Sequence, residues 1–203
     1  LRNAFFSLLS FLRQLVQSKP VKLFQKSRVT ESWVQRPFDS ANRDVLVFAI
    51  IDWHFRIQRP QHIARLLARN GHRVFYFSNH FVDADEPGYQ LEKLPGAVAL
   101  YQVKLHVKGA PAIYFDTPSS QTLAMLSKSI TKVFQDFHVL SSISIVQHAY
   151  WYPLTKQLPN SYQIYDCMDD HEGFGNVPAK LVEAEKEMLR NADLVTVSSP
   201  SLE

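Results

Sequence analysis

Hydrophobic and polar positions follow two different rhythms along most of this chain. From Asp44 onward, continuous apolar runs such as DVLVFAII are followed by stretches such as PQHIARLLARN, in which apolar residues recur every three or four positions. A continuous run rich in β-branched residues is typical of a strand buried on both faces of a parallel sheet, and the second rhythm is typical of an amphipathic helix. This strand, this helix and the strand HRVFYFS that follows therefore predict a βαβ unit.

The same alternation continues to the end of the chain. It predicts strands over 97–105, 142–149, 162–167 and 193–199, helices over 119–137 and 178–192, and a short helical piece over 153–158. Strands that alternate with helices build layered α/β structures. We therefore expect a doubly wound α/β domain over residues 44–203.

A different pattern occupies the first 43 residues. Polar residues recur every three or four positions in residues 1–18, which leaves a wide apolar face and predicts an amphipathic helix that ends near Pro20, followed by a connector. Residues 1–28 contain basic residues and no acid. A helix of this kind lies on an anionic membrane surface or packs on the rest of the protein, and the pattern leaves both open.

Composition narrows the class of protein. The 203 residues are 46% hydrophobic and have a formal net charge of +3, and much of the basic excess lies in the first 28 residues, so the main domain shows no basic surface for nucleic acid. Cys167 is the single cysteine, which excludes an internal disulfide and favours a reducing compartment, the cytoplasm. No apolar run reaches the roughly 18 residues that span a bilayer. The chain opens on Leu1 rather than Met, which indicates a piece of a longer protein.

Ligands of doubly wound sheets bind at the carboxyl ends of the strands, where the strand order reverses. The first loop expected there is DWHFRIQR, and no Ser, Thr, Asp or Asn stands at the start of the next helix to cap its amides. Arg56 and Arg59 therefore make this helix end a candidate anion site, with Trp53 and Phe55 placed to stack on a sugar or base. The alternative is that Asp52 pairs with an arginine while the aromatic rings close the end of the sheet. The loop has no GxGxxG, which argues against a dinucleotide site.

The second loop is QHAYWYP, directly after a predicted strand. His148 can orient a hydroxyl or donate a hydrogen bond to a phosphate there, with Tyr150 and Trp151 as a platform for a sugar. A lone histidine is more often a structural residue, and its place at the carboxyl end of a strand is what favours a functional role.

The third loop is YDCMDDHEGFGN. Its acids and histidine predict a metal site, a general base or a solvated loop; these residues are Asp166, Asp169, Asp170, His171 and Glu172. No recognised ligand spacing is present, so a metal is the least favoured of the three. Cys167 is predicted to pack in the strand.

Three stretches together carry a family resemblance. DWHFRIQRPQHIARLLARNGHRVFYFSN, YDCMDDHEGF and EAEKEMLRNADLVTVSSPSL resemble the N-terminal domain of GT-B glycosyltransferases, in particular bacterial family-four-like enzymes of polysaccharide and cell-surface glycan assembly. The resemblance covers about residues 44–202. It implies a Rossmann-like parallel sheet that mainly holds the acceptor, and a second domain beyond Glu203 that binds the donor. It also implies that the 203 residues are inactive alone.

The resemblance also implies roles for individual residues. His148 matches a histidine that lies near the transferred sugar, and we predict His148 and Asp52 as catalytic residues. The predicted substrate-binding residues are Trp53, Phe55, Arg56, Gln58, Arg59, Tyr150, Asp169, Asp170 and His171. The expected partners are a nucleotide-sugar donor, a glycan or lipid-linked acceptor, and a peripheral contact of residues 1–28 with the inner membrane face; no metal, cofactor or nucleic acid is expected.

Two other functions fit the same architecture. One is a nucleotide-sugar epimerase, which releases an altered sugar nucleotide without an acceptor. The other is a non-catalytic module that binds a glycan or a protein partner through its aromatic loops. The fold alone does not choose among these functions.

Overall fold

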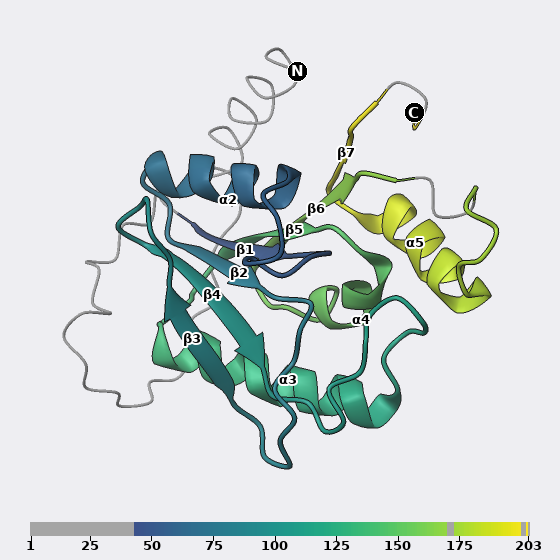
Figure 1. Cartoon of the computed structure of the whole chain (residues 1–203), viewed down its shortest axis with the longest axis horizontal. Helices are drawn as coiled ribbons and strands as arrows, with labels where there is room; N and C mark the ends of the chain where they lie inside the picture. The colour runs from purple at the N-terminus through teal and green to yellow at the C-terminus, as the bar shows by residue number, and fades with distance from the viewer. Residues whose placement is uncertain (1–42, 170–172, 200–201, 203) are drawn as a thin grey trace.

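The computed structural model describes residues 43–169, 173–199 and 202. In this part of the chain, seven strands form one sheet in the order β3-β4-β2-β1-β5-β6-β7 (Figure 1). The strands are β1 (Asp44–Phe48), β2 (Val74–Phe77), β3 (Tyr89–Lys93), β4 (Leu100–Leu105), β5 (Ser142–Val146), β6 (Ser161–Cys167) and β7 (Leu194–Val197). The helices are α2 (Arg59–Arg69), α3 (Ser120–Asp136), the 3-10 helix η1 (Ala149–Trp151), α4 (Tyr152–Thr155) and α5 (Ala179–Asn191).

The sheet is mostly parallel. All neighbouring strands run parallel except β3, which pairs antiparallel with β4 at one edge. The predicted α/β fold with a Rossmann-like, doubly wound sheet is therefore confirmed. The predicted N-terminal amphipathic helix and its connector lie outside the described residues, so they stay predictions.

The helices divide between the two faces of the sheet because successive strand residues point to opposite faces. Val45 and Val47 of β1 belong to the core cluster that contains the apolar side of α2, whereas Leu46 and Phe48 belong to the cluster that contains residues of α3, η1, α4 and α5. Figure 1 shows α2 on one side of the strands and α3 on the other. Trp151, fully buried in the second cluster, donates its indole N–H to the carbonyl of Ala49 and so fixes η1 to the end of β1.

Strand β3 is missing from the elements predicted by hydrophobic pattern. Its sequence YQLEK has only two apolar side chains, Tyr89 and Leu91, and both are partly buried against the core, while the alternate residues are exposed. An edge strand with one face in water carries few apolar residues, so the rule that finds buried strands does not find it.

The point at which the strand order reverses indicates where on the sheet a ligand is expected, and we call this edge the ligand edge. From β1 the chain passes through α2 to β2 on one side, and β5 lies on the other side of β1. The switch point is therefore between β1 and β5, and the loops after these strands, DWHFRIQR and QHAYWYP, meet at its carboxyl edge.

No helix among the described residues has both the length and the hydropathy that a membrane-spanning segment needs.

Candidate functional site

A tyrosine from a distant loop closes over the switch point. Tyr114, in the loop between β4 and α3, donates its hydroxyl to the carbonyl of Ile50 after β1 and accepts from the side-chain amide of Asn79 after β2. Its ring packs edge-on against the imidazole of His148, with 5.6 Å between the ring centres. We call Ile50, Asn79, Tyr114 and His148 the switch-point cluster. It joins the loops that follow β1, β2, β4 and β5.

The position of His148 defines which of its ring nitrogens carries a proton. The residue is buried, and its Nδ1 accepts a hydrogen bond of 3.2 Å from the backbone N–H of Tyr150, which caps the 3-10 helix η1. An imidazole nitrogen that accepts a hydrogen bond carries no proton, so the neutral ring has its proton on Nε2. The neutral His148 is therefore a hydrogen-bond donor at Nε2. Because this nitrogen already carries the proton, it does not act as a base.

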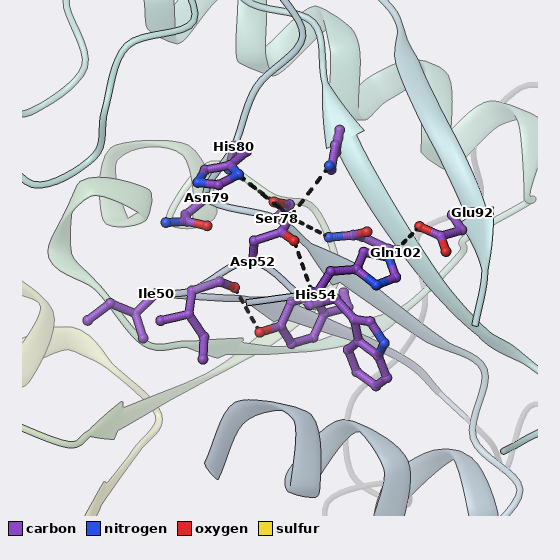
Figure 2. A network of polar contacts seen from close by, with 12 residues as sticks. Ile50, Asp52, His54, Ser78, Asn79, His80, Glu92 and Gln102 are labelled. Carbon is purple, nitrogen blue, oxygen red and sulfur yellow. Dashed lines mark hydrogen bonds and ion pairs between the residues drawn. The ribbon is translucent and has the colours of Figure 1, made fainter. Parts of the chain in front are cut away.

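Asp52 is the centre of a second group, which we call the Asp52 cluster and which contains Asp52, Ser78, His80, Gln102 and Lys104. The buried carboxylate accepts from Ser78 Oγ at 2.7 Å, from Gln102 Nε2 at 2.7 Å and from the backbone N–H of His54 at 2.9 Å (Figure 2). Lys104 Nζ lies 3.6 Å and His80 Nδ1 lies 3.9 Å from the same oxygen, Oδ2. Asp52 thus connects the ends of β1, β2 and β4 and pairs with no arginine of the described part of the chain.

These contacts govern the protonation of Asp52. Burial alone would raise the pKa of this carboxyl, but the hydrogen bonds from Ser78, His54 and Gln102 and the charge of Lys104 outweigh it, so the pKa lies below the ordinary 3.8. A carboxyl with a lowered pKa stabilises the folded state fully above its ordinary value, and this stabilisation is lost as the pH falls through the lower, folded value.

The lowered pKa of Asp52 predicts that the stabilisation by this carboxylate depends on pH. We expect Asp52→Asn to be less stable than the unchanged protein at neutral pH, and the difference in the free energy of unfolding to shrink as the pH falls below 3.8. Urea unfolding followed by circular dichroism over this range measures it. A difference that stays constant with pH would show that the ionised carboxylate is not what stabilises the fold.

Arg59 is part of an ion pair rather than an open anion site. Its Nε donates to both carboxylate oxygens of Asp166, and its terminal nitrogen lies 2.7 Å from Oδ1. Gln147 and Thr196 also donate to Asp166, which lies inside β6 and not in the third loop. The side chain of Arg59 therefore links the start of α2 to β6, the strand that lies beyond β5 in the sheet.

The start of α2 is capped, which the sequence pattern did not predict. Gln58 is the N-cap residue and forms a capping box with Gln61, whose side-chain oxygen accepts from the backbone N–H of Gln58 at 2.9 Å. The expectation that no side chain caps this helix is wrong, because glutamine at these two positions performs the role that Ser or Asp usually has.

The remaining residues of the first loop divide between the interior and the surface. Trp53 is buried, with Tyr76 edge-on at 5.1 Å and the guanidinium of Arg65 at 5.0 Å from its ring. Phe55 is 70% exposed, and Arg56 lies 5.4 Å from its ring centre. Of the two predicted stacking residues, the structure therefore presents only Phe55 to a ligand.

The second and third loops are placed as follows. Tyr150 is buried, and its hydroxyl has no hydrogen-bond partner among the described residues; burial raises its pKa above the ordinary value. The carbonyl of Asp169 accepts from the thiol of Cys167. Asp170 and His171 lie outside the described residues, so their predicted roles remain untested.

Several residues of these clusters were missed by sequence reasoning. Gln102 and Lys104 stand at alternate positions of a predicted strand, AVALYQVKL. A polar or charged side chain inside an apolar strand needs a buried partner, which is the signal that could have identified them. Tyr114 had no such signal, because its role depends on the path of a long loop.

Comparisons with known proteins give little beyond this geometry. No family model matches the chain, and no curated protein does. Among solved structures, the chain is similar to one described as "Trehalose-6-phosphate from E. coli bound with UDP-2-fluoro glucose", with 15% sequence identity and a TM-score of 0.48. The match covers 79% of this chain and 40% of that chain.

Proposed function

We propose that this chain is the acceptor-side domain of a glycosyltransferase that moves a sugar from a nucleotide-sugar donor to a glycan or lipid-linked acceptor. The observation that carries the proposal is the buried His148 at the switch point, whose Nδ1 accepts a hydrogen bond, so that the proton of the neutral ring is on Nε2. Sugar transfer from a nucleotide sugar releases a nucleoside diphosphate, and donors aimed at the developing negative charge accelerate such a step. The sequence resemblance to GT-B enzymes supports the same reaction.

Access to His148 requires movement in this proposal. The imidazole is buried, and the half-exposed Tyr114 packs against it. Substrate binding would displace the loop that carries Tyr114, which breaks the contacts of its hydroxyl with Ile50 and Asn79. The side chain of Asn79 would then be available to a sugar hydroxyl, because its buried Oδ1 has no partner among the described residues.

The surface beside the switch point suits a sugar acceptor. Phe55 is exposed beside Arg56 in the loop after β1, and an aromatic ring face next to a guanidinium can hold the apolar face of a sugar and its hydroxyls. In this proposal, a second domain provides most of the donor binding. The protein lies in the cytoplasm or at the inner membrane face and takes part in glycan assembly.

The proposal is tested on the full-length protein with a panel of nucleotide sugars. We expect release of nucleoside diphosphate from one donor only when a glycan or lipid-linked acceptor is present, and no release from residues 1–203 alone. An altered, free sugar nucleotide formed without acceptor would replace the proposal with an epimerase. Saturable glycan binding without any turnover would replace it with a binding module.

A further inference from the structure

The hydroxyl of Tyr114 occupies a place that supplies both a hydrogen-bond donor and an acceptor. It accepts from Nδ2 of Asn79 at 3.0 Å and donates to the carbonyl of Ile50. We call this amide and this carbonyl the hydroxyl site. Burial raises the pKa of Tyr114, and the hydrogen bond from Asn79 offsets this only in part, so the phenol is protonated at neutral pH. A sugar hydroxyl also donates one hydrogen bond and accepts others, so it fits the same two partners.

The amide of Asn79 offers one more hydrogen bond than Tyr114 uses. The single proton of the phenol goes to Ile50, so its oxygen only accepts, and Asn79 turns its amide nitrogen toward it. The amide oxygen, Oδ1, is buried and has no partner among the described residues. A buried oxygen without a donor costs stability. Tyr114 has no second proton for this oxygen, so the phenol satisfies the hydroxyl site only in part.

Tyr114 can leave the hydroxyl site while its loop stays in place. Ile113 is fully buried in the core and anchors the loop, whereas Tyr114 is 42% exposed and Phe115 is 76% exposed. A rotation about the side-chain torsions of Tyr114 therefore moves its ring into water while Ile113 stays packed. The same rotation uncovers the imidazole of His148, which the ring now contacts edge-on. The displacement that the proposed function requires is thus confined to the residues next to Ile113.

We propose that Tyr114 is an internal competitor of the acceptor, and that the hydroxyl site takes a vicinal diol of the acceptor sugar; this inference rests on the proposed function. One hydroxyl of the diol replaces the phenol between Nδ2 of Asn79 and the carbonyl of Ile50. The adjacent hydroxyl donates its proton to Oδ1 of Asn79, the oxygen for which Tyr114 has no donor. The nitrogen and oxygen of one planar amide lie side by side, as two adjacent hydroxyls of a sugar ring do, so both hydrogen bonds form together.

The first experiment follows the ring of Tyr114 by NMR, without any substrate, in the full-length protein labelled with ¹³C-tyrosine. Asn79→Ala removes one of the two partners of the phenol. We expect the ring signals to move toward those of a solvent-exposed tyrosine, because the population with the ring in water rises about 5-fold. The control is Asp136→Ala, which removes the partner of the Tyr89 hydroxyl and should leave the signals of Tyr114 unchanged.

The second experiment measures KM for the acceptor that is identified by the release of nucleoside diphosphate. Tyr114→Phe keeps the ring and loses both hydrogen bonds of the hydroxyl, so we expect KM for the acceptor to fall about 5-fold. The value of kcat should not change, because a saturating acceptor displaces the ring in either protein. Asn79→Ala removes the hydroxyl site and should raise the same KM about 10-fold. The control Tyr89→Phe loses a hydroxyl that bonds to Asp136 and should keep both constants.

The diol is tested with acceptors that each lack one hydroxyl. In the unchanged protein, two adjacent positions of the sugar should each raise KM about 10-fold when the hydroxyl is removed. In Asn79→Ala, the same two deoxy acceptors should have nearly the KM of the parent acceptor, because the partner of these hydroxyls is already gone.

Three results would overturn the inference and leave glycosyl transfer intact. The first is a set of Tyr114 signals that does not move in Asn79→Ala, and the second is an acceptor KM that stays the same or rises in Tyr114→Phe. The third is a loss of affinity for the deoxy acceptors that is equally large in Asn79→Ala. If the unchanged protein transfers no sugar at all, the proposed function fails and the diol assignment fails with it, whereas the NMR signals still decide whether Tyr114 leaves the hydroxyl site.

Discussion

Replacing Arg59 with alanine is expected to lower the free energy of unfolding by about 2–3 kcal/mol. The Asp166 side chain is 2% exposed and would lose all three hydrogen bonds from the guanidinium, which leaves a buried carboxylate with Gln147 and Thr196 as its remaining donors among the described residues. Breaking a fully buried ion pair costs about 3–5 kcal/mol. The expected loss is smaller because 26% of the Arg59 side chain is in contact with solvent.

Urea unfolding of the unchanged protein and of Arg59→Ala measures this loss in the free energy of unfolding, with Lys108→Ala as the control. Lys108 and Asp85 form an ion pair at the same distance of 2.7 Å, but their side chains are 81% and 80% exposed. Solvent screens such a pair, so the control should show no measurable change. Equal stabilities of the two variants would mean that the burial of Asp166 is not the reason why the Arg59–Asp166 ion pair stabilises the fold.

The largest expected effect on activity belongs to His148→Asn. Asparagine is a good N-cap residue and can accept from the N–H of Tyr150 in place of Nδ1, so the start of η1 stays intact. The substitution removes Nε2 and its proton, which under the proposed function donates to the departing phosphate. We expect kcat/KM of the full-length enzyme to fall about 100-fold or more, with a small decrease of the unfolding midpoint because the ring packing against Tyr114 is lost.

Two comparisons separate this role from a structural one. His62→Asn changes an exposed histidine on α2 and should leave turnover unchanged. His148→Gln extends an amide toward the former position of Nε2 and should recover part of the activity that His148→Asn loses. Full turnover of His148→Asn would show that the residue only caps η1, and the proposed function would lose the observation that carries it.

The fold was predictable because its signals are local. The β-branched runs of β1 and the apolar period of α2 depend on residues close together in the sequence, and both elements appear within a few positions of the expected bounds. Strand β3 was missed because an edge strand with one face in water has no such signal.

The site was predictable only to the level of loops. The carboxyl ends of strands meet at one edge, so the loops that contain Asp52 and His148 were expected there. The partners of each side chain were not predictable, because they come from distant positions: Asp166 is separated from Arg59 by 107 residues, and Gln102 is separated from Asp52 by 50. The burial of Trp53 was not predictable for the same reason, because its ring packs against Tyr76 of the next strand.

The Arg59–Asp166 ion pair also affects the cooperativity of the domain. Arg59 begins the helix that packs beside β1, β2 and β4, and Asp166 belongs to β6 on the other side of the switch point. A hinge that separates the two halves of the sheet at this point would first have to break a buried charge pair. Under the proposed function, we expect the floor beneath the ligand edge to stay in one piece, so that the loops above it, foremost the one that carries Tyr114, adapt to the shape of a substrate.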